Sequence, residues 1–194
     1  MQDETYDIVV IGAGIVGIAA AYALTRAGMN KVAIIDQEPP LSVTSDKSTE
    51  CYRNFWPGPD NAMLALINDS IGHLAAHTQT SGDRFQMQQR GYLFATTRSQ
   101  EIEALAQQAV QVEEFGGGAL RWHNRNDAAS PYQPSPDHGI SSTLDGADLI
   151  TDRGLIQQQF PYLHDDTAGV LHVRNCGSLS AQQLGMYLLS LIHI

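Results

Sequence analysis

The sequence predicts an α/β protein, because three patterns near its start follow in the order strand, helix, strand. A short β-branched run at residues 7–11 is typical of a buried parallel strand. Small and apolar residues at 15–27 predict a helix, which Gly28 ends. A second β-branched run at residues 31–35 indicates another buried strand. These elements predict one βαβ unit of a Rossmann-like, dinucleotide-binding domain.

Three glycines join the first predicted strand to the helix in the pattern Gly-x-Gly-x-x-Gly. Gly12 permits a tight turn, Gly14 lets a pyrophosphate approach the backbone, and Gly17 lets the helix pack close to the strand. The free N–H groups and the dipole at the start of the helix favour an anion. The residues that we expect at the pyrophosphate are Gly12, Ala13, Gly14, Ile15, Val16 and Gly17.

Asp36 follows the second predicted strand, where a ribose-binding acid belongs in such a unit, and Gln37 lies beside it. An acid at this position fits a free ribose, so NADP is disfavoured, but the motif does not separate NAD from FAD. A plain NAD domain would soon continue with a third strand. Instead, a polar loop covers residues 39–59 and offers hydrogen bonds to a second large polar group. Its polar residues include Ser45, Lys47, Ser48, Thr49, Glu50, Arg53 and Asn54.

Composition limits the class of partner. The 194 residues carry a formal net charge of −10, which argues against nucleic acid or an anionic membrane. Two cysteines, Cys51 and Cys176, fit a reduced cytosol. The acidic start does not resemble a secretory signal, and the longest apolar stretch, residues 184–194, is about half of a membrane span. We therefore expect a soluble, cytoplasmic protein that acts on a small molecule.

The sequence resembles the D-amino-acid-oxidase-like family of FAD-dependent oxidoreductases, and most of all its sarcosine oxidase and dimethylglycine dehydrogenase branch. The resemblance covers most of residues 6–188. It rests on IGAGIVG, the acid at Asp36, the Ser/Thr-rich loop with an arginine at 48–53, GYLFAT from Gly91, FPYL, and GSLSAQQLGMYLL. The family usually has Glu where this chain has Asp36, and both side chains can accept bonds from ribose hydroxyls.

The resemblance implies FAD as the cofactor and oxidation of the C–N bond of an amine or N-methylated amino acid by hydride transfer to the flavin. The imine would then hydrolyse, and oxygen or an electron-acceptor partner would reoxidise the flavin. Ser45, Lys47, Ser48 and Thr49 would line the path to the flavin, with Arg53 near the ring or the substrate carboxylate. For Lys47 and Arg53, a surface salt bridge is the alternative.

The resemblance names no catalytic base. The loop at residues 41–56 has no histidine, which excludes a histidyl link to flavin there. Cys51 is a candidate link, with a small buried thiol as the alternative. Three further possibilities stay open: an NAD-linked dehydrogenase, a non-catalytic flavin-binding subunit of a complex, and a chain that aggregates through an uncovered apolar sheet face.

The predicted organisation is interrupted rather than linear. We expect the first part of an FAD-binding domain at residues 1–84, an α+β substrate domain at 85–175, and a helix returning to the FAD-binding domain at 176–188. The last six residues, 189–194, can be encoded by the end of a transposon adapter used in DNA library preparation, so we expect a non-native tail there. On this interpretation the chain is an N-terminal fragment with an incomplete FAD-binding domain, inactive by itself.

Local signals predict the remaining elements. Asp60 or Asn61 begins a helix to about residue 80, and residues 85–97 form two short strands around Gly91. Ser99 caps a helix that ends at 116–118, and residues 124–148 form a long surface loop. A short helix that Thr151 or Asp152 caps and Pro161 closes, a strand at 169–174 and a capping box from Ser180 follow. His73 and His77 lie one helical turn apart, but no third ligand is nearby, so we predict no metal site.

Overall fold

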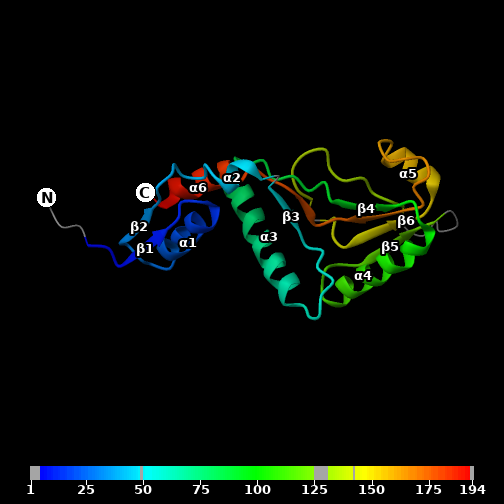
Figure 1. The fold of residues 1–194 in the computed structure, drawn as a ribbon, viewed down its shortest axis with the longest axis horizontal. Helices are drawn as coiled ribbons and strands as arrows, with labels where there is room; N and C mark the ends of the chain where they lie inside the picture. The colour runs from blue at the N-terminus through cyan, green and yellow to red at the C-terminus, as the bar shows by residue number, and fades with distance from the viewer. Residues whose placement is uncertain (1–4, 49, 125–130, 142, 193–194) are drawn as a thin grey trace. The chain divides into compact units, whose positions relative to one another are not determined.

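The computed structural model describes the chain except residues 1–4, 49, 125–130, 142 and 193–194. The chain divides into two compact units. The first unit contains Met1–Glu50, His77–Gln86 and Leu179–Ile194, and the second contains Cys51–Ala76 and Met87–Ser178. Both are mixtures of helices and strands, which confirms the predicted α/β class (Figure 1). The predicted domain limits at residues 84, 175 and 188 remain predictions.

The first unit contains the predicted βαβ arrangement. β1 (Ile8–Ile11) and β2 (Val32–Ile35) pair in parallel, and α1 (Ile15–Arg26) connects them. Ile18 and Ala21 of α1 are fully buried. Gly28, just after the helix, has a φ of +93°, a conformation that glycine adopts without a steric penalty. The glycine that was predicted to end the helix therefore does so.

The expectation that both strands are buried is wrong for one face of the sheet. Val9, Ile11 and Ile35 are 50%, 84% and 51% exposed. Side chains alternate between the two faces of a strand, and Ile11 pairs directly with Ile35. Val10, on the opposite face, lies toward Gly17 at the start of α1. Within the described part of the first unit, helices cover that face alone, and the other presents an apolar patch to solvent.

α6 (Ala181–Ile192) packs against α1 in the first unit. It begins as predicted, because the Gln183 N–H donates to Ser180 Oγ at 3.2 Å. A second acceptor comes from far away in the sequence: Glu50 Oε2 accepts from the Ala181 N–H at 2.7 Å. These two acceptors satisfy N–H groups that the first turn of a helix leaves unpaired. The start of α6 is therefore fixed both by its own sequence and by the loop after β2.

Of the two histidines on α3 (Ala62–Ser81), His77 packs against aromatic rings and His73 lies at the surface. The His77 ring lies edge-on between Tyr22 and Tyr187, with centroid distances of 5.3 and 5.7 Å. Exposed His73 lies 3.6 Å from the carboxylate of Asp69, one turn earlier. No cluster of three metal-ligating side chains occurs among the described residues.

The second unit is built on a sheet of four strands, β4 (Tyr92–Thr96), β5 (Leu120–His123), β6 (Ala147–Ile150) and β7 (Gly169–Val173). Their order in the sheet is β4-β7-β6-β5 (Figure 1). β5 and β6 are parallel neighbours, whereas β4 pairs antiparallel with β7, and β7 with β6.

Among the described residues, apolar clusters on the two faces of the sheet hold the second unit together. The first joins Leu149, Leu171 and Val173 of the sheet to α4 (Ile102–Glu114), through Ala106, Ala109 and Val112. The second joins Ile150 and Val170 to Ile156 of α5 (Arg153–Gln159) and to Phe160. Side chains point alternately to the two faces of the sheet along each strand. One face packs against α4 and the other against α5 and Phe160, so both faces are covered.

The helix starts in this unit follow their sequence signals in two cases. Asp60 Oδ1 accepts from the Ala62 N–H at 3.0 Å at the start of α3. Asp152 Oδ1 accepts from the N–H groups of Gly154 and Leu155 at the start of α5. Two short strands, β3 (Cys51–Arg53) and β8 (Cys176–Ser178), pair antiparallel in the same unit.

Three local expectations need correction. Ser99 does not cap α4, because residues 99–101 form the 3₁₀ turn η1 (Ser99–Glu101) before it. The long loop ends two residues early, since Ala147 and Asp148 already belong to buried β6. Before Gly91 there is only an isolated bridge from Gln88 to Ser178 among the described residues, and one strand, β4, after it.

The longest apolar stretch of the sequence is too short for a membrane span, so no membrane-spanning helix is predicted. In the ranges that the structure describes, no helix has both the length and the apolar character needed to cross a bilayer.

Candidate functional site

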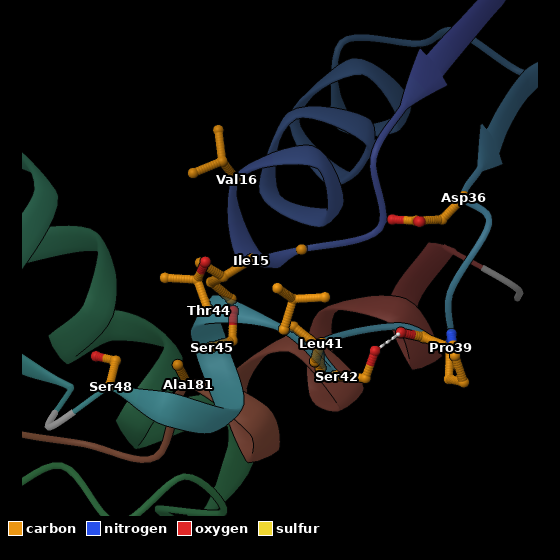
Figure 2. A pocket seen from close by; sticks show the side chains of 12 residues that line it. Ile15, Val16, Asp36, Pro39, Leu41, Ser42, Thr44, Ser45, Ser48 and Ala181 are labelled. Atoms are coloured by element: carbon orange, nitrogen blue, oxygen red, sulfur yellow. Dashed lines mark hydrogen bonds between the residues drawn. The ribbon is translucent and has the colours of Figure 1, made fainter.

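A cleft of about 400 Å³ opens at the start of α1 in the first unit (Figure 2). This volume is within the range of small-molecule and cofactor sites. The cleft joins the glycine turn, the end of β2, the loop after β2 and the start of α6. Its lining residues are Gly14, Ile15, Val16, Asp36, Pro39, Leu41, Ser42, Val43, Thr44, Ser45, Ser48 and Ala181.

The three glycines meet three different steric demands. Gly12 has a φ of +109°, outside the range that other residues usually adopt. A Cβ at Gly17 would overlap the carbonyl oxygen of Gly12. A Cβ at Gly14 would meet no protein atom within 4 Å, and Gly14 lines the cleft. Gly12 and Gly17 are thus required by the turn, whereas Gly14 leaves room beside the backbone for a ligand.

The start of α1 is suited to an anion. Gly14 is the N-cap and has no side chain to accept a hydrogen bond, and the first turn contains no acidic residue. The N–H groups of the first turn and the positive end of the helix dipole therefore face the cleft without a nearby carboxylate on the same helix. A phosphate bound there would replace the missing cap.

Asp36 is held at the end of β2 with its carboxylate toward the glycine turn (Figure 2). Oδ2 accepts from the Ala13 N–H at 2.7 Å, and Oδ1 accepts from the Glu38 N–H at 3.0 Å. The bond from Ala13, followed by that from Glu38, lowers the pKa of Asp36, so it is charged at neutral pH. Each oxygen keeps a further lone pair, which can accept a hydroxyl of a ribose. Gln37 follows in sequence and does not line the cleft.

The loop after β2 supplies the far wall of the cleft through α2 (Thr44–Lys47). Ser45 is buried and Ser48 lies at the end of this helix, and both line the cleft. Lys47 does not line it, and forms an exposed ion pair with neighbouring Asp46. Thr49 lies outside the described residues.

Sequence reasoning missed several cleft residues. Leu41 enters through a left-handed turn with a φ of +64°, and its N–H donates to the Ala13 carbonyl at 3.0 Å. Ala181 comes from α6, more than a hundred residues beyond the glycine turn. The capping box marked the start of α6, but a local motif carries no information about which distant loop the helix meets. Ser42, Val43 and Thr44 could have been included with the polar loop.

Arg53 belongs to the second unit, where it lines a separate hollow of about 390 Å³. Its guanidinium carbon lies 4.6 Å from the centre of the Trp56 ring and 5.7 Å from that of Tyr92. Within the described residues Arg53 forms no ion pair with a carboxylate. Cys51 lines the same hollow and is exposed, which excludes a buried thiol there.

The geometry of the first unit fits a dinucleotide whose pyrophosphate lies at the helix start and whose ribose lies at Asp36. Such a βαβ unit defines the class of dinucleotide-binding proteins. A family model described as DAO, FAD dependent oxidoreductase, matches residues 7–190. The chain therefore belongs to this family of FAD-dependent oxidoreductases, and FAD is the cofactor that the family uses.

Solved structures share the fold at low sequence identity. L-proline dehydrogenase from P. horikoshii is 19% identical, with a TM-score of 0.74 over 98% of this chain and 42% of that one. Glycine oxidase from Bacillus cereus ATCC 14579 is 17% identical, with a TM-score of 0.69 over 97% and 44%. Iminodiacetate oxidase from Chelativorans sp. BNC1 is 20% identical, with a TM-score of 0.63 over 96% and 44%. The chain thus spans less than half the length of these structures.

A curated relative is similar over a shorter region. Thioredoxin reductase from Ureaplasma parvum serovar 3 is 39% identical in an 83-residue alignment that covers 39% of this chain and 27% of that protein.

Proposed function

We propose that this chain binds FAD and forms part of an enzyme that oxidises the C–N bond of an amine or N-methylated amino acid. The observation that supports it best is the cleft at the start of α1, with its glycine turn and charged Asp36, in a chain of the FAD-dependent oxidoreductase family. The proteins with the same fold include a proline dehydrogenase, a glycine oxidase and an iminodiacetate oxidase, and their names favour an amino-acid-like substrate.

Different residues of the cleft bind different parts of the cofactor. Gly12, Gly14 and Gly17 give the turn its shape, and the N–H groups that follow, at Ile15 and Val16, bind the pyrophosphate. Ala13 holds the Asp36 carboxylate, which accepts the hydroxyls of the adenosine ribose. Ser45 and Ser48, which line the cleft beyond Asp36, lead from there toward the flavin, whereas Gln37, Lys47 and Thr49 stay predictions from the sequence alone.

Arg53 supplies the group that recognises the substrate carboxylate. Its guanidinium is held by two aromatic rings and has no carboxylate partner among the described residues, so its charge remains available to a ligand. The neighbouring hollow has apolar walls at Ile67, Ile71 and Leu74, suited to methyl and methylene groups. When bound, FAD would accept the hydride that is removed as the C–N bond is oxidised. The resulting imine hydrolyses in water without a further group from this chain.

A visible absorption spectrum of the purified natural full-length gene product tests the proposal. The spectrum is recorded before and after anaerobic addition of sarcosine, dimethylglycine or proline. A yellow protein that bleaches with one of them supports an amine oxidoreductase. A yellow protein that none of them bleaches contradicts this substrate class and favours a flavin-binding subunit. A colourless protein that does not take up added FAD contradicts the cofactor assignment as well.

A further inference from the structure

A charged cluster is buried in the second unit. Its centre is Asp148 of β6, whose pairing partners across the sheet are Arg121 on β5 and His172 on β7. Asp148 is 3% exposed and accepts from Arg121 Nε at 2.8 Å and Nη2 at 3.0 Å. His123 Nε2 lies 2.7 Å from the same carboxylate. The cluster occupies the side of the sheet opposite α4, since neighbouring Leu149 belongs to the α4-facing core.

Arg174 extends the cluster and is 1% exposed. Its Nη1 donates to His172 Nδ1 at 2.6 Å, and its Nη2 donates to the Gln133 carbonyl at 2.5 Å. Its Nε lies 3.3 Å from Asp148 Oδ2, but this N–H makes no hydrogen bond within the described residues. A buried guanidinium N–H without a bond is costly, so it indicates an acceptor beyond those that the described residues provide.

A cavity of about 140 Å³ adjoins these groups. Its lining residues are Arg121, Pro131, Gln133, Thr143, Leu144, Asp148 and Arg174. Arg121 retains a donor there as well, because its Nη1 makes only a 3.5 Å contact with the Ala119 carbonyl and lies 3.8 Å from Asp145. The lining thus combines two guanidinium groups with one carboxylate, and Asp145 is 72% exposed and screened by water.

The His172 ring is neutral, so it does not add to the charge of the cluster. Its Nδ1 accepts from Arg174 and its Nε2 lies 2.9 Å from the Arg90 carbonyl, a pattern that requires the neutral ring protonated on Nε2. A lining with one excess positive charge disfavours a cation, and a neutral ligand would leave that charge without a counter-ion.

We propose that this cavity binds a small oxyanion, either inorganic phosphate or a short carboxylate. The oxyanion accepts from the guanidinium groups of Arg174 and Arg121, which line the cavity, and neutralises the excess charge of the cluster. Phosphate has five heavy atoms and acetate has four, sizes that fit the volume of the cavity. The site is independent of the cofactor cleft, because all of its residues belong to the second unit.

Side-chain NMR of the 194-residue chain tests the site directly. The Nε–H signals of the arginines are followed while phosphate, and separately acetate, replaces chloride at constant ionic strength. We expect a saturable shift of the Arg174 signal with at least one of the two anions. The anion that binds more tightly identifies the ligand as a phosphate or a carboxylate. Amide signals of residues 12–17 report binding at the glycine turn separately.

Matched variants assign the binding. Arg121→Gln should weaken it about tenfold, and Arg121→Lys, which keeps the charge but not the fork, should weaken it less. Arg153→Gln removes an exposed arginine of α5 and should have no effect. Since Arg121→Gln takes two bonds from Asp148, Arg121→Lys is the variant to use if it does not fold. A shift confined to the glycine turn, no shift with either anion, or an unchanged affinity in both Arg121 variants would overturn the proposal.

Discussion

Gly17 faces the carbonyl oxygen of Gly12 so closely that a methyl group on Gly17 would overlap it. A methyl group on Gly14, two residues after Gly12, would meet no protein atom within 4 Å. The two glycines of one motif are therefore needed for different reasons, one for the fold and the other for the ligand.

Alanine variants separate these two roles. Gly17→Ala should destabilise the first unit by about 3 kcal/mol or more, because the turn and the helix must move apart. Gly14→Ala should cost less than about 1 kcal/mol, as expected for loss of a glycine N-cap, yet weaken FAD binding at least about tenfold. Thermal denaturation and FAD titration of both variants check this. Equal stability of the two variants would contradict the steric argument.

Asp36 is predicted to act through its carboxylate oxygens. Asp36→Ala should weaken FAD binding at least about tenfold, since both the ribose acceptor and the bond to Ala13 are lost. Asp36→Glu keeps a carboxylate that can accept from ribose hydroxyls and should retain most of the affinity. FAD titration measures both, and Asp7→Ala, an exposed acid before β1, is the control. Full affinity in Asp36→Ala would rule out the ribose role.

Arg53 should determine the preference for a carboxylate in the full-length enzyme. Arg53→Gln is expected to raise KM for sarcosine by about tenfold to a hundredfold, because a charge-assisted bond is lost. An amine substrate without a carboxylate should be affected much less. Steady-state kinetics with both substrates test this, and Arg98→Gln, at an exposed arginine, serves as the control. If both substrates suffer alike, Arg53 acts on the structure and not on recognition.

His172 should make stability depend on pH. Burial and, next, the charge of Arg174 lower its pKa from 6.5 to about 4. In the unfolded chain this histidine therefore takes up a proton near pH 6.5, whereas in the folded chain it does so only near pH 4. Stability should be complete above pH 6.5 and fall by on the order of 3 kcal/mol as pH decreases through this window.

Replacing His172 isolates this contribution. His172→Gln should make the pH dependence between 4 and 6.5 less steep, whatever it does to stability at neutral pH. Urea denaturation at several pH values measures the slope. His164→Gln, at an exposed histidine, should leave the slope unchanged. An identical slope in wild type and His172→Gln would mean that other groups cause the dependence.

The apolar patch on β1 and β2 should promote self-association of the 194-residue chain. Ile11→Thr combined with Ile35→Thr removes its two facing side chains while keeping β-branched residues in the strands. Light scattering should show less aggregation at equal protein concentration. Leu66→Gln, at another exposed apolar residue, should change it little. Unchanged aggregation in the double variant would show that a different surface is responsible.

The sequence predicted what depends on neighbouring residues. The glycine turn, Asp36 at the end of β2 and the Asp152 cap of α5 are local patterns, and the structure contains each of them. Contacts between distant residues were not predictable. Ala181 reaches the cleft only because α6 packs on α1, and no signal near either residue states this.

Misleading local signals explain the other errors. Asp148 follows a segment rich in Pro, Ser, Asp and Gly, so a charged residue there indicated a loop. Its burial in β6 depends on Arg121 and Arg174, which lie more than twenty residues away on either side. Exposure of Ile11 was missed for a similar reason, since a β-branched run does not reveal how many layers cover the strand.

The bond between Glu50 and the first N–H of α6 spans 131 positions of the chain. A ribosome needs on the order of ten seconds to synthesise that interval. During this time β1, α1 and β2 exist without the helix that completes the cleft. The wall of the cleft that Ala181 contributes is therefore added late in biosynthesis, long after the glycine turn has been made.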